Sequence, residues 1–376
     1  MKNERRNDLD WLRVLVFALL ILYHVGMFFV PWGWHLKNNV IYEWLKWPMI
    51  FVNQWRLPIL FLISGMGTFY ALGKRSWGKF SRERLLRLGV PLIVGMLLIV
   101  PPQVYYERLG QGSFSGSYLE FQNIAFDGIY PEGNLSWHHL WFLPYLLLFS
   151  LLLSPLMVRI AQRPGRFMEG IGRLLQKPGN LYLLVAPLYL IEVFVEPFFP
   201  VTHALIGDWF TLVFNGYLFF LGFVLIGAGP LFWAGLEKIR KTALVIGLLA
   251  FSALLVLWLG FADSVLVHFI EGALKVVNLW SWILVLLAYA SKLLNRPSNT
   301  LAYANRAVYP FYILHQTITV ALAYYLMDLD WGLLPKALIL ILGTFGLSWA
   351  IYDLIILRIS WLHPLFGLKP KKKLAT

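Results

Sequence analysis

The sequence contains no cysteine in 376 residues. Without a thiol, the chain forms no disulfide, holds no thiolate-bound metal and uses no cysteine nucleophile. Charge is scarce as well, because charged residues make up 14% of the chain, against about 25% in a typical soluble domain. A water-facing surface requires more charge than this. The composition therefore excludes an ordinary soluble globular protein.

Three functional signatures are also absent from the sequence. It has no GxxxxGK[ST] phosphate loop, so we do not expect ATP-driven transport by this chain. It has no GxSxG nucleophile elbow either. No short spacing of His, Asp and Glu supplies the three or four ligands that a zinc site needs. We therefore expect no bound metal and no permanently bound cofactor.

What the sequence does have is apolar runs, since 59% of its residues are hydrophobic. About 20 mostly apolar residues cross the hydrocarbon core of a bilayer. We predict ten such spans, near 11–31, 47–72, 88–105, 139–158, 180–198, 211–229, 242–262, 276–294, 307–327 and 334–358. Ionisable side chains dilute the stretch 263–275, which we expect to be a short interfacial helix or an outer loop.

The segments between the spans alternate in charge. Lys and Arg concentrate in 73–87, 159–177, 238–241, 292–306 and the tail 366–376, whereas 106–138, 196–210 and 328–333 have few or none. Because cytoplasmic segments carry the basic residues, the pattern predicts an all-α bundle of ten transmembrane helices with both termini cytoplasmic. We expect one membrane-embedded domain over 1–376, with 106–138 as an outer loop. The net charge of +13 then faces anionic lipid and not nucleic acid.

Ionisable residues inside a span are costly and often functional. Arg13 and His24 are 11 residues apart in the first span, so helical geometry places them within about 20° of each other and about 16 Å apart along the axis. Asp10 falls on the same side, at the i,i+3 position from Arg13. Arg13 by itself is typical of a cytoplasmic anchor. His24 fits a general base that removes a proton from a hydroxyl, with an interhelical hydrogen bond as the alternative.

Two arginines stand one turn apart before the third span. Arg84 and Arg87 carry permanent, forked charges that can hold phosphate groups bidentately. A purely topological role as cytoplasmic anchors explains them equally well.

Aromatic and histidine side chains open the fourth span. His139 and Trp141 are candidates for binding a polar acceptor, with Trp141 stacking on a sugar ring, although an interfacial aromatic belt is the simpler interpretation. The neighbouring His138 is, like His139, a candidate for assisting catalysis or binding the acceptor, and which role it has is left open.

Two further spans hold candidate supporting residues. Glu192 and Glu196 share a face of the fifth span. They are candidates for pairing with a histidine or an arginine, and an interfacial location explains Glu196 equally well. His315, with Gln316 beside it, lies in the ninth span, where a packed and hydrogen-bonded histidine is the default.

Several of these segments occur together in a known family. The chain resembles the acyltransferase-3 family of integral-membrane acyltransferases, and is most similar to its glucan-succinylating branch. The resemblance covers nearly the whole chain. It depends on the motifs Leu9-Asp-Trp-Leu-Arg13 with His24 after ten residues, Leu57-Pro-Ile-Leu-Phe-Leu-Ile-Ser-Gly65, Arg84-Leu-Leu-Arg-Leu-Gly-Val-Pro91, His139-Leu-Trp-Phe-Leu143 and Tyr309-Pro-Phe-Tyr-Ile-Leu-His-Gln316.

The resemblance implies ten core helices and transfer of an acyl group to a hydroxyl of an exported carbohydrate in the bacterial inner membrane. It makes Arg13 and His24 the essential pair, and it associates Arg84 and Arg87 with a cytoplasmic acyl-CoA donor. Succinyl and acetyl groups, several envelope glycans, direct transfer and a covalent acyl-enzyme all stay open, as does the oligomeric state. The alternatives are a proton-coupled transporter with His24, Glu192 and His315 as its relay, and a scaffold without enzymatic activity.

Overall fold

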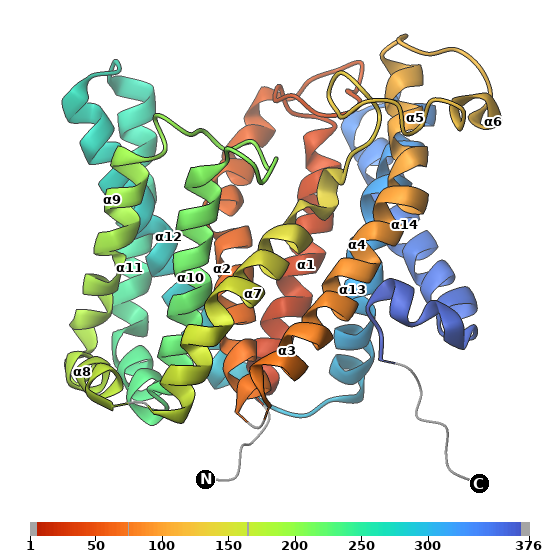
Figure 1. Cartoon of the computed structure of the whole chain (residues 1–376). Coiled ribbons are helices and arrows are strands. Elements are labelled where there is room, and N and C mark those ends of the chain that lie inside the picture. Colours follow the sequence, from red (N-terminus) through yellow and green to blue (C-terminus); the bar gives the residue numbers. More distant parts are fainter. Residues whose placement is uncertain (1–5, 74, 164, 370–376) are drawn as a thin grey trace, which may run out of the picture. The chain divides into compact units, whose positions relative to one another are not determined.

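The computed structural model describes residues 6–73, 75–163 and 165–369, and every regular element among them is helical. The principal helices, shown in Figure 1, are α1 (Asn7–Met27), α2 (Lys46–Leu72), α5 (Val100–Gly110), α7 (Phe142–Gln162), α8 (Gly165–Leu175), α9 (Ala186–Phe194), α10 (Trp209–Gly227), α11 (Pro230–Gly260), α12 (Val265–Leu293), α13 (Asn299–Leu326) and α14 (Leu333–Ala350). Shorter elements are α3 (Trp77–Arg84), α4 (Val90–Val94), α6 (Tyr118–Phe121), the 3-10 turns η1 (Glu43–Leu45), η4 (His138–Trp141), η5 (Pro178–Val185), η7 (Ser360–Leu362) and η8 (Pro364–Phe366), and the π-helical turns η2 (Leu85–Gly89), η3 (Gly95–Ile99) and η6 (Ile351–Ile356).

Eight helical segments of the described chain are long and apolar enough to cross a membrane. They are Asn7–Met27, Glu43–Leu72, Trp77–Gly110, His138–Gln162, Trp209–Gly227, Pro230–Gly260, Val265–Leu293 and Leu333–Ile356. The multi-pass helical architecture is thereby confirmed. The predicted fifth span corresponds to the shorter apolar segment Pro178–Phe194, and the predicted ninth span lies in α13.

One expectation about the chain's organisation is wrong. The stretch 263–275 is neither a separate interfacial helix nor an outer loop, because α12 runs without a break from Val265 to Leu293. Its first turn is capped by Ser264, whose hydroxyl accepts from the backbone N–H of Val267. A cap of this kind fixes the helix start, so the polar residues that follow belong to the first turns of a long helix.

The described residues form two compact units that alternate along the chain. The first unit comprises the residues up to Arg13, Phe51–Arg82 and Tyr145–Leu301. The second comprises Val14–Ile50, Glu83–Pro144 and the residues from Ala302 onward. Helix α1 thus contributes Arg13 to the first unit and His24 to the second.

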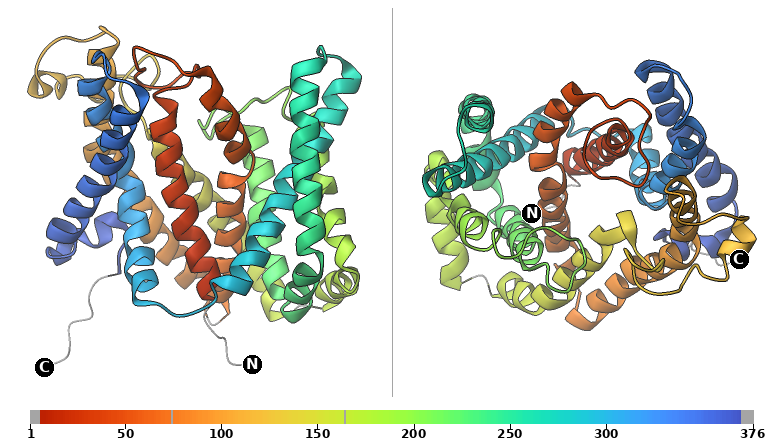
Figure 2. Two further views of the ribbon diagram at one scale, coloured as in Figure 1. Left: turned by 180° about the vertical axis from the view of Figure 1, so that it is seen from behind. Right: turned by 90° about the horizontal axis from the view of Figure 1, so that it is seen from above.

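Glycines allow α2 and α10 to cross closely in the first unit. A side chain at Gly65 would meet the carbonyl oxygen of Phe219 at 1.8 Å, and one at Gly222 would meet that of Leu62 at 2.0 Å. Small residues permit such backbone contact between membrane helices, where dispersion replaces the hydrophobic effect as the driving force. In the same unit α11 and α12 pack along each other and are joined by the short segment 261–264 (Figure 2).

The second unit is built around α1, α13 and α14. Its apolar core includes Phe28, Phe29 and Leu36 from the loop after α1, and Val320 and Leu340 from α13 and α14. Burial of these side chains holds the segment 28–42 against the helix ends, so that this loop is part of the packed core.

Two lysines hold that loop in place through hydrogen bonds. Lys37 Nζ donates to the carbonyl oxygens of Met27 at 2.5 Å and Trp32 at 3.0 Å, and also to that of Val30. Fully buried Lys336 donates to Asn38 Oδ1 at 2.6 Å. Burial lowers the pKa of Lys37 to about 8. These bonds fix the backbone on both sides of His35.

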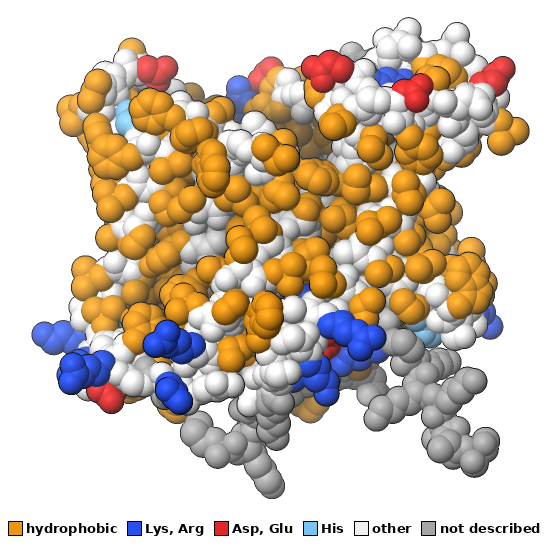
Figure 3. All heavy atoms as spheres, in the orientation of Figure 1, with side chains coloured by type: hydrophobic (Ala, Val, Ile, Leu, Met, Phe, Trp, Pro, Cys, Tyr) orange, Lys and Arg blue, Asp and Glu red, His pale blue; other side chains and the backbone are white. Residues whose placement is uncertain are grey.

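The polypeptide between α3 and α5 contains two π-helical turns. Arg84 ends α3 and Arg87 lies in η2, so a wider turn separates them than an α-helix would. Figure 3 shows Lys and Arg side chains gathered around α3 and α8, and hydrophobic side chains over the middle of the surface. Lys74 of the predicted basic segment 73–87, and residues 370–376 of the predicted tail, lie outside the described residues.

Candidate active site

His24 and His315 form a hydrogen-bonded pair in the second unit. His24 Nδ1 lies 2.8 Å from His315 Nε2, and the two rings are stacked with centroids 5.1 Å apart. His24 stands in the last turn of α1 and is half-buried, whereas His315 in α13 is fully buried. The interhelical hydrogen bond expected for a histidine in a span is therefore present, and it joins two histidines.

The partners of His315 determine which nitrogen of His24 is basic. His315 Nδ1 lies 2.8 Å from the backbone carbonyl oxygen of Tyr312, which can only accept, so Nδ1 carries the proton. Nε2 of a neutral His315 then accepts the bond from the Nδ1–H of His24. The lone pair of a neutral His24 is consequently on its Nε2. This is the arrangement of a general base whose tautomer is set by a second residue.

His139 packs against the same pair. Its ring centroid lies 5.1 Å from that of His315 in an edge-to-face contact, and its Nε2 is 3.0 Å from the carbonyl oxygen of Ile313. The Tyr312 hydroxyl donates to the His139 carbonyl oxygen at 2.6 Å. Because Nε2 donates to a carbonyl, the lone pair of a neutral His139 is on Nδ1, a buried atom with no hydrogen-bond partner among the described atoms. Trp141 ends the same short turn, η4.

A line of side chains on α13 connects this site with the arginines of the second unit. The Tyr309 and Tyr312 rings are stacked with centroids 6.4 Å apart, and the buried Tyr309 hydroxyl lies within electrostatic range of Arg84 and Arg87. Since residues three apart share a helix face, Tyr309, Tyr312 and His315 form one stripe. The stripe leads from the arginines to the histidine pair.

An apolar cavity lies beside the stripe. It has a volume of about 190 Å³ and lies between α1, α13 and α14, with Phe17, Ile21, Phe311, Tyr312 and His315 in its wall. Almost all of its lining is hydrocarbon, with His315 as its one imidazole. A short apolar or weakly polar group fits this space.

The remaining candidates lie in the first unit. Arg13 Nη1 donates to Asp10 Oδ1 at 3.1 Å, which is the i,i+3 pair predicted from the sequence. Among the described residues, the ion-pair partner of Glu192 is Lys275 at 3.4 Å and not the predicted histidine or arginine. Glu196 follows the end of α9 and is half-buried.

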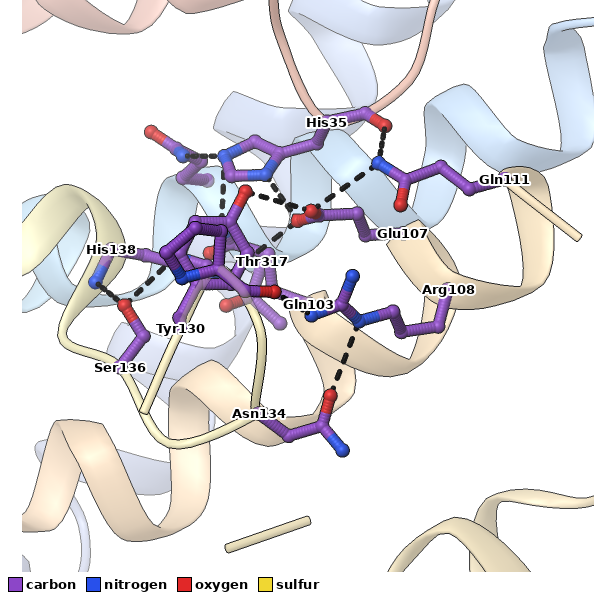
Figure 4. Close-up of polar contacts among 12 residues, drawn as sticks. His35, Gln103, Glu107, Arg108, Gln111, Tyr130, Asn134, Ser136, His138 and Thr317 are labelled. Atoms are coloured by element: carbon purple, nitrogen blue, oxygen red, sulfur yellow. Dashed lines mark hydrogen bonds and ion pairs between the residues drawn. The ribbon is translucent and has the colours of Figure 1, made fainter. Parts of the chain in front are cut away.

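Sequence reasoning missed a second cluster in the second unit, shown in Figure 4. His35, Glu107 and His138 point toward one another, with their potential metal-ligating atoms all within 4.8 Å. Tyr130 donates to Glu107 Oε1 at 2.9 Å, and burial together with the Glu107 carboxylate raises the pKa of Tyr130 to about 12. The only signal in the sequence was the unassigned His138, because the three residues are far apart along the chain.

A basic pocket in the first unit was also not predicted. It has a volume of about 850 Å³, and its wall includes Arg6, Arg240, Lys292 and Trp233. The Arg6 guanidinium lies 3.5 Å above the Trp233 ring and pairs with Asp8 at 2.5 Å. The lining suits an anionic group, although Asp8 and Glu237, which pair with Arg6 and Arg240, neutralise part of the positive charge.

These features define a multi-pass membrane protein whose helices hold a hydrogen-bonded histidine pair. A family model described as an acyltransferase domain (Acyl_transf_3) matches residues 6–353. The chain therefore belongs to the acyltransferase-3 family and is a membrane acyltransferase, as its motifs predicted.

Similar curated proteins agree with this assignment. The chain is 24% identical over 388 residues to the "Glucans biosynthesis protein C" of Shigella dysenteriae serotype 1, covering 98% of this chain and 96% of the relative. It is 24% identical over 387 residues to the protein of the same name from Escherichia coli K12, with the same coverage of both chains. No solved structure matches the chain. Family membership and the pairing of Glu192 with Lys275 favour acyl transfer over the proton-relay alternative.

Proposed function

We propose that the protein transfers an acyl group from acyl-CoA to a hydroxyl of a cell-envelope carbohydrate, with His24 as the general base. The observation that carries the proposal is the His24–His315 hydrogen bond of 2.8 Å, since it leaves the lone pair of His24 on Nε2. In the proposed step the sugar oxygen attacks the thioester carbonyl while Nε2 takes the hydroxyl proton. The carbon–sulfur bond then breaks, and His24 returns the proton to the departing CoA thiolate.

The donor is proposed to bind along the α13 stripe. Arg84 and Arg87 would hold the CoA phosphates, because guanidinium groups bind phosphate oxygens bidentately. The pantetheine arm would pass Tyr309 and Tyr312, and the hydrocarbon part of the acyl group would lie at the apolar cavity whose wall includes His315. The carboxylate of a succinyl group would have to lie outside this cavity, because burying a charge without a polar partner is unfavourable. Arg13 is proposed to assist from the cytoplasmic end of α1, which is one continuous helix through His24.

The acceptor is proposed to enter at the other end of α1. His139 and Trp141 would contact the sugar there, and the segment 106–138 would form the outer wall. We assign supporting roles to Glu192, Glu196 and Asp10. The curated relatives carry the word glucans in their names, so a glucan is the first acceptor to test, with succinyl and acetyl as the candidate acyl groups.

The proposed topology places both termini in the cytoplasm of a bacterium. It comprises the eight long apolar segments together with Pro178–Phe194 and α13, which gives ten spans in the inner membrane. Cysteine accessibility provides the test, because the chain has no native cysteine to interfere. Single cysteines in 106–138 should react with an impermeant reagent added outside, whereas those in 165–175 should not; the reverse pattern refutes the topology.

His24→Ala is the decisive test of the proposed function. Loss of a general base lowers the rate by about 10²- to 10⁴-fold, while insertion into the membrane should be unchanged. Mass spectrometry of envelope glycans from cells carrying either version measures both the acyl group and its carrier. Near-normal transfer by a properly inserted His24→Ala protein would refute the assignment.

The donor site has an internal control. The Arg84→Gln/Arg87→Gln protein should show a raised KM for acyl-CoA. Arg240→Gln with Lys292→Gln, in the basic pocket of the first unit, is the matched control. If only the control pair raises the donor KM, the phosphates bind in that pocket and the assignment to Arg84 and Arg87 is wrong.

A further inference from the structure

Three segments of the second unit bring potential metal ligands together. His35 comes from the loop after α1, Glu107 from α5 and His138 from the start of η4 (Figure 4). Their side chains are 12%, 1% and 3% exposed, respectively. Two imidazoles and one carboxylate are among the ligands that zinc takes in proteins. Such a set differs from an exposed acidic cluster, because it is buried and mixes nitrogen with oxygen donors.

Contacts within the cluster leave one nitrogen unsatisfied. His35 Nδ1 is in direct contact with Glu107 Oε2. His138 Nε2 lies 3.7 Å from that same oxygen, which is beyond hydrogen-bond distance, and it has no hydrogen-bond partner among the described atoms. A buried polar atom without a partner is unfavourable and needs an explanation. A cation between the three groups would coordinate this nitrogen and the carboxylate together.

Outer contacts hold each ligand in position. His138 Nδ1 lies 3.1 Å from Ser136 Oγ, and Glu107 Oε1 accepts from the Tyr130 hydroxyl at 2.9 Å. Such outer partners orient metal ligands and set their tautomers. They also direct His138 Nε2 and Glu107 Oε2 toward the same space.

Two glutamines complete the surroundings of His35. Its Nε2 lies 3.0 Å from Gln103 Nε2 and 2.8 Å from Gln316 Nε2, while both amide oxygens are buried without a hydrogen-bond partner among the described atoms. Rotating either amide by 180° would present an oxygen to an Nε2–H of His35, since amide orientation is an assignment. His35 Nδ1 would then have a lone pair for a metal ion. The unsatisfied oxygens therefore fit the tautomer that a metal requires.

The backbone around two of these residues is held in a defined conformation. His138 has a φ of 40°, a left-handed conformation that is unfavourable for a residue with a side chain. The hydrogen bonds from Lys37 Nζ to backbone carbonyl oxygens hold the loop that contains His35 in place. Strain of this type persists where the surrounding structure enforces it, often at functional sites.

We propose that His35, Glu107 and His138 bind one Zn²⁺ ion. Three protein ligands leave a fourth position for water or a hydroxyl group, as in zinc sites that bind a substrate. The inference is independent of the acyl-transfer mechanism, because it concerns binding of the metal alone.

The test measures zinc bound to the purified full-length protein in detergent. After removal of metal with a chelator and equilibration with ZnCl₂, the unaltered protein should retain one zinc per chain. Glu107→Gln and His138→Ala should each weaken zinc binding at least tenfold. Glu271→Gln and His268→Ala, in α12 of the first unit, are matched controls and should bind zinc normally.

A second measurement keeps the test valid if one variant folds poorly. Zinc should raise the thermal midpoint of the unaltered protein, since a ligand that binds only the folded state stabilises it. It should not raise the midpoint of His35→Asn or of Glu107→Gln. Absence of zinc from the unaltered protein, or equal zinc binding by these variants and the controls, would overturn the proposal.

Discussion

His315 offers the sharpest test of the histidine pair. Its Nε2 accepts from His24 at 2.8 Å, and its Nδ1–H is fixed by a carbonyl oxygen at 2.8 Å. Replacing His315 by Ala removes the acceptor that keeps the proton of His24 on Nδ1. The general base is then free to adopt the other tautomer and to rotate. We expect slower acyl transfer with His24 still in place.

The magnitude follows from the bond that is lost. His24 gains a positive charge in the transition state, so the bond to His315 becomes charge-assisted and contributes about 1.5–3 kcal/mol. Each 1.36 kcal/mol of barrier changes a rate about tenfold, which predicts a fall in kcat of about 10- to 150-fold. Most of this range lies below the loss of about 10²- to 10⁴-fold expected when the base itself is removed.

The assay is acyl transfer by purified protein with varied acyl-CoA. For His315→Ala, kcat should fall while the KM for the donor stays unchanged. His315→Gln should recover part of the lost rate, because its amide oxygen can accept from His24. His268→Ala in α12 is the control, since its imidazole contacts the Val193 carbonyl oxygen at 3.0 Å in the first unit. A kcat of His315→Ala within twofold of the unaltered enzyme would refute the reasoning.

Three further outcomes follow from the geometry. Arg84→Gln with Arg87→Gln should raise the KM for acyl-CoA at least tenfold with little change in kcat, because lost charge-assisted bonds contribute about 1.5–3 kcal/mol each; an unchanged KM contradicts the donor role. Gly65→Ala should destabilise the protein by about 1–3 kcal/mol or more in thermal unfolding, since its Cβ would lie 1.8 Å from a carbonyl oxygen of α10, whereas Gly170→Ala has open space. The raised pKa of Tyr130 stabilises the fold below the unfolded value of about 10, and this contribution is lost as pH rises through about 12. The tyrosinate absorbance difference between the unaltered protein and Tyr130→Phe should therefore titrate near pH 12, and titration near pH 10 would contradict the assignment.

Most of the membrane architecture could be predicted from the sequence, because hydropathy is a local property. Helix length and composition alone identify eight spans of the described chain. The i,i+3 pair of Asp10 and Arg13 is equally local and is present as predicted. The prediction of a break in the helix before residue 276 was wrong. A capping serine and tertiary packing outweigh a few polar residues in a long helix. Polar composition distinguishes such a stretch from the apolar spans, but it does not determine whether the backbone there is helical.

The sequence by itself determined the membrane class and the family, and it predicted a catalytic role for His24, since each inference depends on residue type and on spacing within one segment. Only the tertiary structure decided the partners. His24 and His315 meet across 291 residues, and His35 meets Glu107 across 72. Helix packing brings such residues together, and their spacing along the chain does not show which of them will be in contact. The expectation of no metal site considered only that spacing, whereas the fold assembles a buried His–Glu–His cluster from three segments.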